Sequence, residues 1–132
     1  EQIDWFANAL IEDDAAHTVI IQHIFYTSGT SVNPMASNIQ TIAGAYNSRS
    51  SVTLNGTTYN FAGCTGKIAC VIAGHSHFDA IVTDDVSVPV WLTTNMMDGN
   101  TPTFDLCIID YTAGKMKSVR VGTGVNREMT LA

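Results

Sequence analysis

The first 47 residues show three successive sequence patterns, and each of them predicts a helix or a strand. Over residues 2–13 the apolar residues recur three and four positions apart, which predicts an amphipathic helix. Residues 18–24 are a run rich in β-branched side chains, which is typical of a strand buried on both faces. Asn33-Pro34 then places a capping residue before a proline, so we expect a second helix from there to about Asn47.

The rest of the chain is rich in strand signals. Asn55-Gly56 lies between residues 52–54 and 57–59, and both turn residues tolerate positive φ, so this segment predicts a β-hairpin. Residues 68–73 are a second continuous apolar strand. We expect further strands at residues 78–83, 88–93, 104–111 and 115–121, the last two forming an antiparallel hairpin. This order indicates an α/β fold, a mixed β-sheet with two helices on one face and hairpins.

Composition narrows the classes of partner. The 132 residues are 45% hydrophobic and 14% charged, which suits one modest core, so residues 1–132 are expected to form a single domain. We expect Trp5 and Trp91 to lie in its core or at a sheet interface. The net charge of −6 and the scattering of only six Lys and Arg residues argue against a nucleic-acid-binding surface. No apolar run approaches the roughly 20 residues of a membrane span, and no signal-peptide pattern is visible, so the sequence predicts no membrane partner and leaves the compartment open.

Three histidines are the residues of this sequence that indicate a binding site. His23 lies at the end of the first buried strand, and Gly74-His75-Ser76-His77 follows the second. A neutral imidazole binds divalent transition metals, and the carboxyl ends of strands are where α/β folds place ligand sites. Gly74 allows close approach of the backbone, and histidines at i and i+2 of an extended segment project to the same side. The sequence therefore predicts a metal site formed by His23, His75 and His77.

A strand-terminal histidine followed by a Gly-His-x-His tetrad resembles the last two metal-binding motifs of the calcineurin-like metallophosphoesterases. The earlier motifs of that family, Asp-x-His, Gly-Asp-x-x-Asp and Gly-Asn-His-Asp/Glu, do not occur, and Asp98-Gly99-Asn100-Thr101 matches the third only in part. The resemblance implies that the chain is the C-terminal half of such a domain, a truncated part of its αββα sandwich.

The resemblance also implies a dinuclear site with two divalent metal ions, manganese, iron or zinc, about 3.5 to 4 Å apart. His23 and His75 would bind one ion and His77 the other, on a loop supported by Gly74. Asp79 follows the tetrad, and its carboxylate would orient a metal-binding imidazole by accepting a hydrogen bond from the ring nitrogen that does not bind the metal. The substrate would be a phosphate ester, and the bridging carboxylate and catalytic groups would belong to the missing N-terminal half, so the chain alone is expected to be inactive. The apolar sheet face that this half would cover predicts a homo-oligomer.

Two alternatives stay open at this stage. The histidines of a non-catalytic metal-binding or assembly module would hold one structural ion and perform no chemistry. A mononuclear zinc hydrolase would require His23, His75 and His77 to converge on one ion, which matches the three protein ligands of catalytic zinc.

Overall fold

The computed structural model describes residues 1–94, 97–98 and 101–132; Gly99 and Asn100 of the partial third-motif match lie outside these residues. The elements in the described part are α1 (Gln2–Glu12), β1 (His17–Ile24), β2 (Tyr26–Ser28), β3 (Ser31–Val32), α2 (Pro34–Asn47), β4 (Ser51–Leu54), β5 (Thr57–Asn60), β6 (Lys67–Gly74), β7 (Ala80–Val82), β8 (Val90–Leu92), β9 (Met97–Asp98), β10 (Thr101–Pro102), β11 (Phe104–Asp110), β12 (Lys115–Val121) and β13 (Glu128–Thr130). Both predicted helices and the predicted strand segments are therefore present, most within two residues of their expected limits.

The two helices form where local signals predicted them. In α1, Ile3, Ala7 and Leu10 are buried along one stripe of the helix. In α2, the Asn33 side chain caps the first turn by accepting a hydrogen bond from the Met35 backbone N–H at 2.8 Å. With 11 and 14 residues, α1 and α2, the helices of the described residues, fall short of a membrane-spanning helix.

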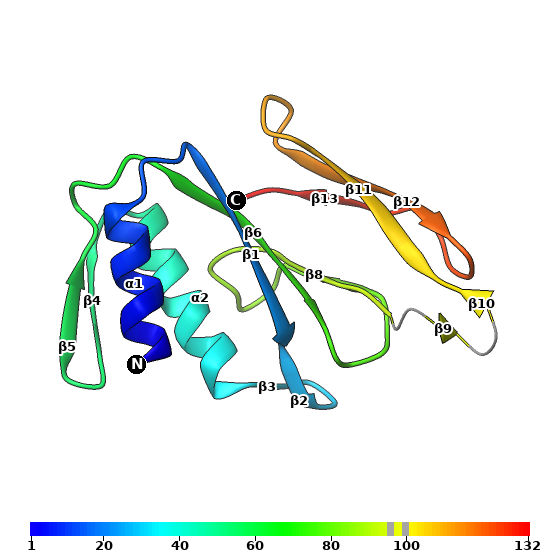
Figure 1. Ribbon diagram of the computed structural model, residues 1–132, viewed down its shortest axis with the longest axis horizontal. Helices are drawn as coiled ribbons and strands as arrows, with labels where there is room; N and C mark the ends of the chain where they lie inside the picture. The colour runs from blue at the N-terminus through cyan, green and yellow to red at the C-terminus, as the bar shows by residue number, and fades with distance from the viewer. Residues whose placement is uncertain (95–96, 99–100) are drawn as a thin grey trace.

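The central sheet has the strand order β1-β6-β8-β7 (Figure 1). Strands β1, β6 and β8 run parallel, and β7 runs antiparallel to β8. On one face, side chains of β6 join those of α1 and α2 in the larger hydrophobic cluster. Because β6 is covered on its other face as well, its sequence is almost continuously apolar.

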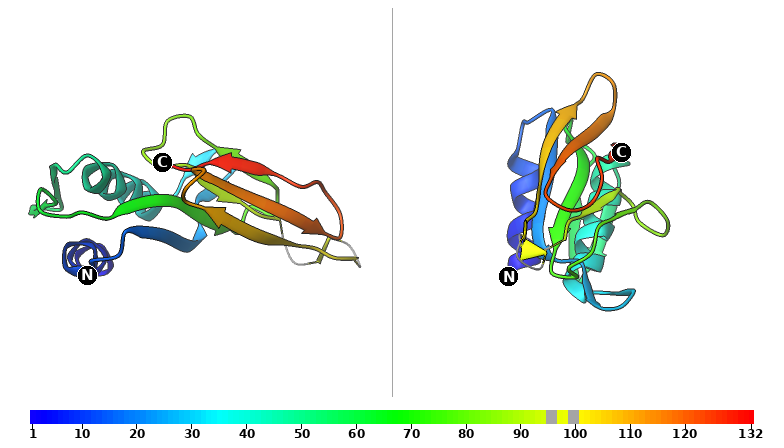
Figure 2. Two further views of the ribbon diagram at one scale, coloured as in Figure 1. Left: turned by 90° about the horizontal axis from the view of Figure 1, so that it is seen from above. Right: turned by 90° about the vertical axis from the view of Figure 1, so that its right-hand side faces the viewer.

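A second sheet, with the order β11-β12-β13, packs on the opposite face of the central sheet. Cys70 and Trp91 from the central sheet meet Met116 and Met129 from the second sheet in a smaller buried cluster. Figures 1 and 2 show the resulting arrangement, in which the helices and the second sheet lie on opposite sides of the central strands. The α/β class with two helices, a mixed sheet and hairpins is thus confirmed.

The predicted antiparallel hairpin of residues 104–111 and 115–121 is present, and with β13 it forms a sheet separate from the central one. The structure differs from the sequence prediction at one tryptophan. Trp5 was expected in the core or at a sheet interface but is 72% exposed, whereas Trp91 is buried as expected. Trp5 lies off the stripe of α1 that carries Ile3, Ala7 and Leu10, so its side chain is not directed into the helix-covered core.

Candidate metal centre

The fold brings His23 and His75 together from positions 52 residues apart. His23 is the last residue but one of β1, and His75 directly follows β6. These strands are parallel neighbours, with Gln22 paired with Ala73 and Ile24 with Gly74, so their carboxyl ends reach the same edge of the sheet. Both imidazole side chains are exposed at this edge.

The two imidazoles face each other through their nitrogens. His23 Nε2 and His75 Nδ1 are 3.2 Å apart, and the rings meet edge to face with centroids 5.0 Å apart. Two imidazole nitrogens that bind one zinc ion at about 2.0 to 2.1 Å lie about 3.0 to 3.4 Å apart, depending on the angle at the metal. The observed separation lies within this range, and it is also the separation of a direct N–H···N hydrogen bond between the two rings.

The tetrad turns sharply as it leaves β6. The Ser76 backbone N–H donates to the Gly74 carbonyl at 2.8 Å, and His75 at the centre of this γ-turn has a φ of 67°. His77 also has positive φ, 55°, and its exposed side chain leaves the same loop. Gly74 is not sterically required here, because a Cβ added to it would meet only the His23 carbonyl oxygen at 3.9 Å.

His77 is not grouped with the other two histidines. Within residues 1–94, 97–98 and 101–132, no three His, Cys, Asp or Glu side chains are close enough together to hold a metal ion. The arrangement therefore offers a two-histidine pair, with a third histidine two residues further along the same loop.

Asp79 binds arginine side chains from the second sheet. Its Oδ1 accepts hydrogen bonds from Arg120 Nη2 at 2.6 Å and from the Thr94 backbone N–H at 3.0 Å, and it forms an ion pair with Arg127 at 3.2 Å. Burial by itself raises the pKa of the Asp79 carboxyl, but these donors outweigh it and the pKa is lowered. The role of Asp79 in orienting an imidazole remains a prediction. Its observed partners hold the end of the loop that begins with Gly74-His75-Ser76-His77.

Asp105 lies at the centre of a charge cluster that is buried except at Asp79, and which we call the Asp-Arg cluster: Asp79, Asp105, Arg120 and Arg127. The Asp105 side chain is 5% exposed and the Arg120 side chain 2%. Burial raises the pKa of the Asp105 carboxyl, but hydrogen bonds from Arg120 and Arg127 outweigh this effect and lower the pKa to about 2. Sequence reasoning missed the cluster; two arginines within eight residues of each other in a chain with only six basic residues were the one available signal.

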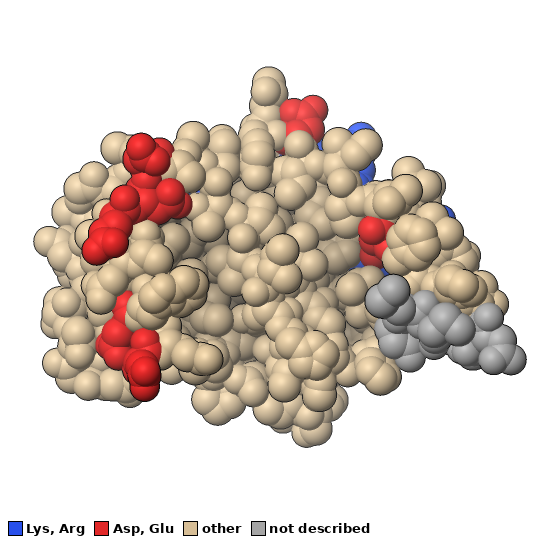
Figure 3. All heavy atoms as spheres, in the orientation of Figure 1, with Lys and Arg blue, Asp and Glu red and all other residues tan. Residues whose placement is uncertain are grey.

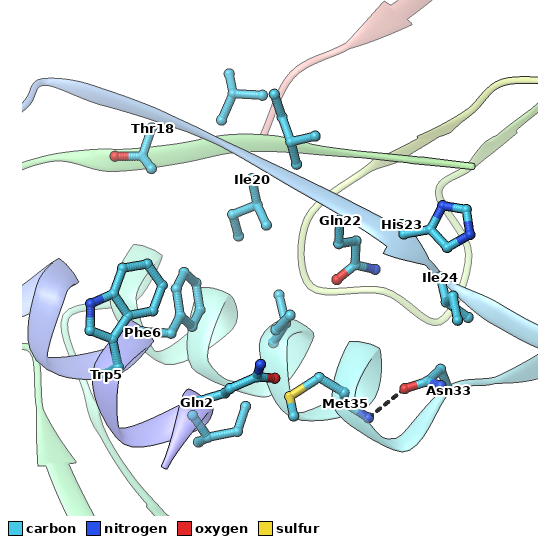
Figure 4. A pocket seen from close by; sticks show the side chains of 14 residues that line it. Gln2, Trp5, Phe6, Thr18, Ile20, Gln22, His23, Ile24, Asn33 and Met35 are labelled. Atoms are coloured by element: carbon cyan, nitrogen blue, oxygen red, sulfur yellow. Dashed lines mark hydrogen bonds between the residues drawn. The ribbon is translucent and has the colours of Figure 1, made fainter. Parts of the chain in front are cut away.

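Two hollows adjoin His23. A shallow one of about 380 Å³ lies between the ends of β1, β6 and β8 and is lined by His23, Gly74 and Thr93. A larger groove of about 540 Å³ lies between β1 and the helices. Figure 4 shows Ile20 and Gln22 projecting from β1 into this groove, towards Phe6 and Met35, while His23 stands at its end. The candidate centre thus borders open space on both sides of β1.

No protein-family model, curated protein or solved structure matches this chain. The chemistry of the centre therefore rests on its own geometry and on the motif resemblance.

Proposed function

We propose that this chain carries part of the dinuclear metal site of a calcineurin-like metallophosphoesterase, a hydrolase of phosphate esters, and corresponds to the C-terminal half of its αββα sandwich. The observation that supports this most directly is the 3.2 Å separation of His23 Nε2 and His75 Nδ1 at the carboxyl ends of two parallel strands. The Gly-His-x-His spacing supplies the second support, since it places His77 on the same loop for a second ion.

The chain's own residues would act as ligands in this function. A hydrogen bond between the facing nitrogens needs a hydrogen on one of them, whereas a cation held between them would need a lone pair on both; the ring that bears the hydrogen meets this need by moving it to its other nitrogen. Divalent ions held in such a site would polarise a phosphoryl group and would provide a hydroxide nucleophile at neutral pH. The carboxylate and amide ligands that complete the site would come from a polypeptide segment with the three missing motifs.

The proposal is tested by titrating the 132-residue chain with Zn²⁺ and Mn²⁺ in a calorimeter. We expect binding of one ion with an affinity that falls at least about tenfold in His23→Ala and in His75→Ala, because each substitution removes half of the pair. His17→Ala is the matched control. His17 lies at the other end of β1, where its ring stacks on Tyr111 with centroids 4.1 Å apart.

Two outcomes would contradict the proposal. One is the absence of metal binding by the unmodified chain at millimolar ion concentration, and the other is an equal loss in His17→Ala and His75→Ala. The phosphoesterase part is tested separately, by reading the coding sequence that precedes these residues in the gene. Asp-x-His, Gly-Asp-x-x-Asp and Gly-Asn-His motifs are expected there, and a sequence without them would favour a non-catalytic module.

A second candidate function, an assembly module, is favoured by one exposed face. Alternate side chains of the paired strands β11 and β12 point away from the core: Phe104, Leu106, Ile108, Val119 and Val121. Figure 3 shows that carboxylates gather mainly at the end of the molecule that carries α1, while uncharged side chains form the middle of the face it displays. In this function a second copy would cover the β11–β12 face and the histidine pair would hold a structural ion.

A further inference from the structure

The loop that carries His75 and His77 adopts an unfavourable backbone conformation. Both residues have positive φ, 67° and 55°, in a region that side chains with a Cβ avoid because of steric conflict with the backbone. Such conformations persist only where surrounding interactions determine them. The γ-turn at Gly74 and Ser76 holds the first half of the loop, so another contact must hold the second half.

Thr94 supplies that contact with two groups at once. Its hydroxyl donates to the His77 carbonyl oxygen at 3.1 Å, and its backbone N–H donates to Asp79 Oδ1 at 3.0 Å. Thr94 follows β8, whose chain is itself bound to β6 because the Thr93 N–H donates to the Ala73 carbonyl at 3.1 Å. The loop after β6 is therefore fastened to the loop after β8.

The Asp-Arg cluster secures the far side of this connection. Arg120, whose side chain is 2% exposed, donates to Asp79 at 2.6 Å and to Asp105 at 2.9 Å. Asp79 thus cannot follow a moving loop without breaking a charge-assisted hydrogen bond to a buried guanidinium. Of the two Thr94 contacts, only the hydroxyl bond acts directly on the backbone of His77.

We propose that Thr94 is a positioning residue, whose hydroxyl holds the His75–His77 loop in the conformation that sets His75 against His23. With the hydroxyl removed, the loop relaxes towards ordinary φ values and the imidazole of His75 leaves its position 3.2 Å from His23. The consequence for metal affinity rests on the proposed function, whereas the consequence for the histidine pair does not.

The experiment compares Thr94→Val with Thr94→Ser in the 132-residue chain. Valine has nearly the shape of threonine but lacks the hydroxyl, and serine restores it, so the pair isolates one hydrogen bond. Thr83→Val is the control, since among the described residues its hydroxyl has one side-chain partner, Asp84 at 3.5 Å, in a neighbouring loop. The urea unfolding midpoint of each variant shows whether the fold is retained.

Two readouts follow the loop. The first is the ¹H–¹⁵N spectrum of the His23 and His75 imidazoles in the metal-free protein at mildly alkaline pH. We expect the chemical shifts that mark the His23 and His75 imidazoles as hydrogen-bonded to each other to be lost in Thr94→Val. They should be retained in Thr94→Ser and Thr83→Val. The second is the Zn²⁺ affinity, which should fall about threefold to tenfold in Thr94→Val alone, as expected for the loss of one neutral hydrogen bond.

The results separate this inference from the proposed function. Unchanged imidazole spectra in a folded Thr94→Val protein would overturn the positioning role, and so would equal changes in Thr94→Val and Thr94→Ser. If the unmodified chain bound no zinc while Thr94→Val still disrupted the histidine pair, the metal site would be refuted and the positioning role supported. A loss of both pairing and zinc affinity in Thr94→Val, reversed in Thr94→Ser, would support both.

Discussion

Replacement of Asp105 by asparagine should destabilise the protein strongly. The carboxylate accepts five hydrogen bonds, two from Arg120 and one each from Arg127, Trp91 and Thr93. Arg127 also lies over the Trp91 ring, with its guanidinium carbon 4.1 Å from the centroid. An asparagine amide at this position would keep one acceptor oxygen but no charge, so two buried arginines would share only Asp79.

The size of the effect follows from the burial of the charges. Removing one partner of a buried ion pair costs about 3 to 5 kcal/mol, because the remaining charge is left without compensation. Asp79 still faces both arginines at 2.6 and 3.2 Å, so the lower end of that range applies, about 3 kcal/mol. With a urea m-value of about 2 kcal/mol/M, the unfolding midpoint should fall by about 1.5 M.

The same carboxylate makes the stability depend on pH. The pKa of Asp105 is lowered from 3.8 to about 2 in the folded protein, a difference that corresponds to about 2 to 3 kcal/mol. Because the folded-state pKa is the lower one, this contribution is present in full above about pH 4 and is lost as the pH falls towards 2. The free energy of unfolding of Asp105→Asn should therefore decline less steeply than that of the unmodified protein over this interval.

Urea unfolding followed by Trp fluorescence, at neutral pH and at several values below pH 4, measures both effects. Asp84→Asn is the matched control, since Asp84 is exposed and, within the described part of the chain, its side chain accepts a single long hydrogen bond, of 3.5 Å from Thr83. Its free energy of unfolding should change by less than about 0.5 kcal/mol. A loss below about 1 kcal/mol in Asp105→Asn, or an unaltered acid slope, would refute the reasoning.

Two further predictions concern the isolated chain. It should hydrolyse a generic phosphodiester or phosphomonoester little faster than free metal does, because histidines without a bridging carboxylate hold two divalent ions poorly. Steady-state assays with added Mn²⁺ check this prediction. Robust turnover that His75→Ala abolishes would show that the site is complete. It should also self-associate through the β11–β12 face, where Leu106 is 57% and Ile108 69% exposed. Light scattering should give at least a dimer that Leu106→Lys dissociates, and a stable monomer at tens of micromolar would contradict the prediction.

The sequence by itself was sufficient for the local structure and for the edge of the sheet that carries the histidines. Helix α2 begins at an Asn-Pro cap, and the β4–β5 turn has positive φ at Asn55 and Gly56, 51° and 81°. These features depend on residues within one turn of each other, so nearest-neighbour rules predict them. Two buried strands of an α/β unit run parallel, and this alone predicts that the residues at their ends, His23 and His75, share one edge.

Tertiary structure alone decided which side chains meet. His75 pairs with His23 while His77, two residues later, does not join them, because positive φ at both histidines turns the loop between them. Asp79 binds Arg120, which reaches it because the second sheet packs across the central one, and no local pattern in the sequence indicated this partner. Hydrophobic periodicity specifies the face of a helix or strand on which a residue lies. It does not specify which residue far along the chain pairs with a charged side chain on that face. That choice is made when the two sheets pack together and bury Asp105 and Arg120, because an unpaired charge there would cost far more than at the surface.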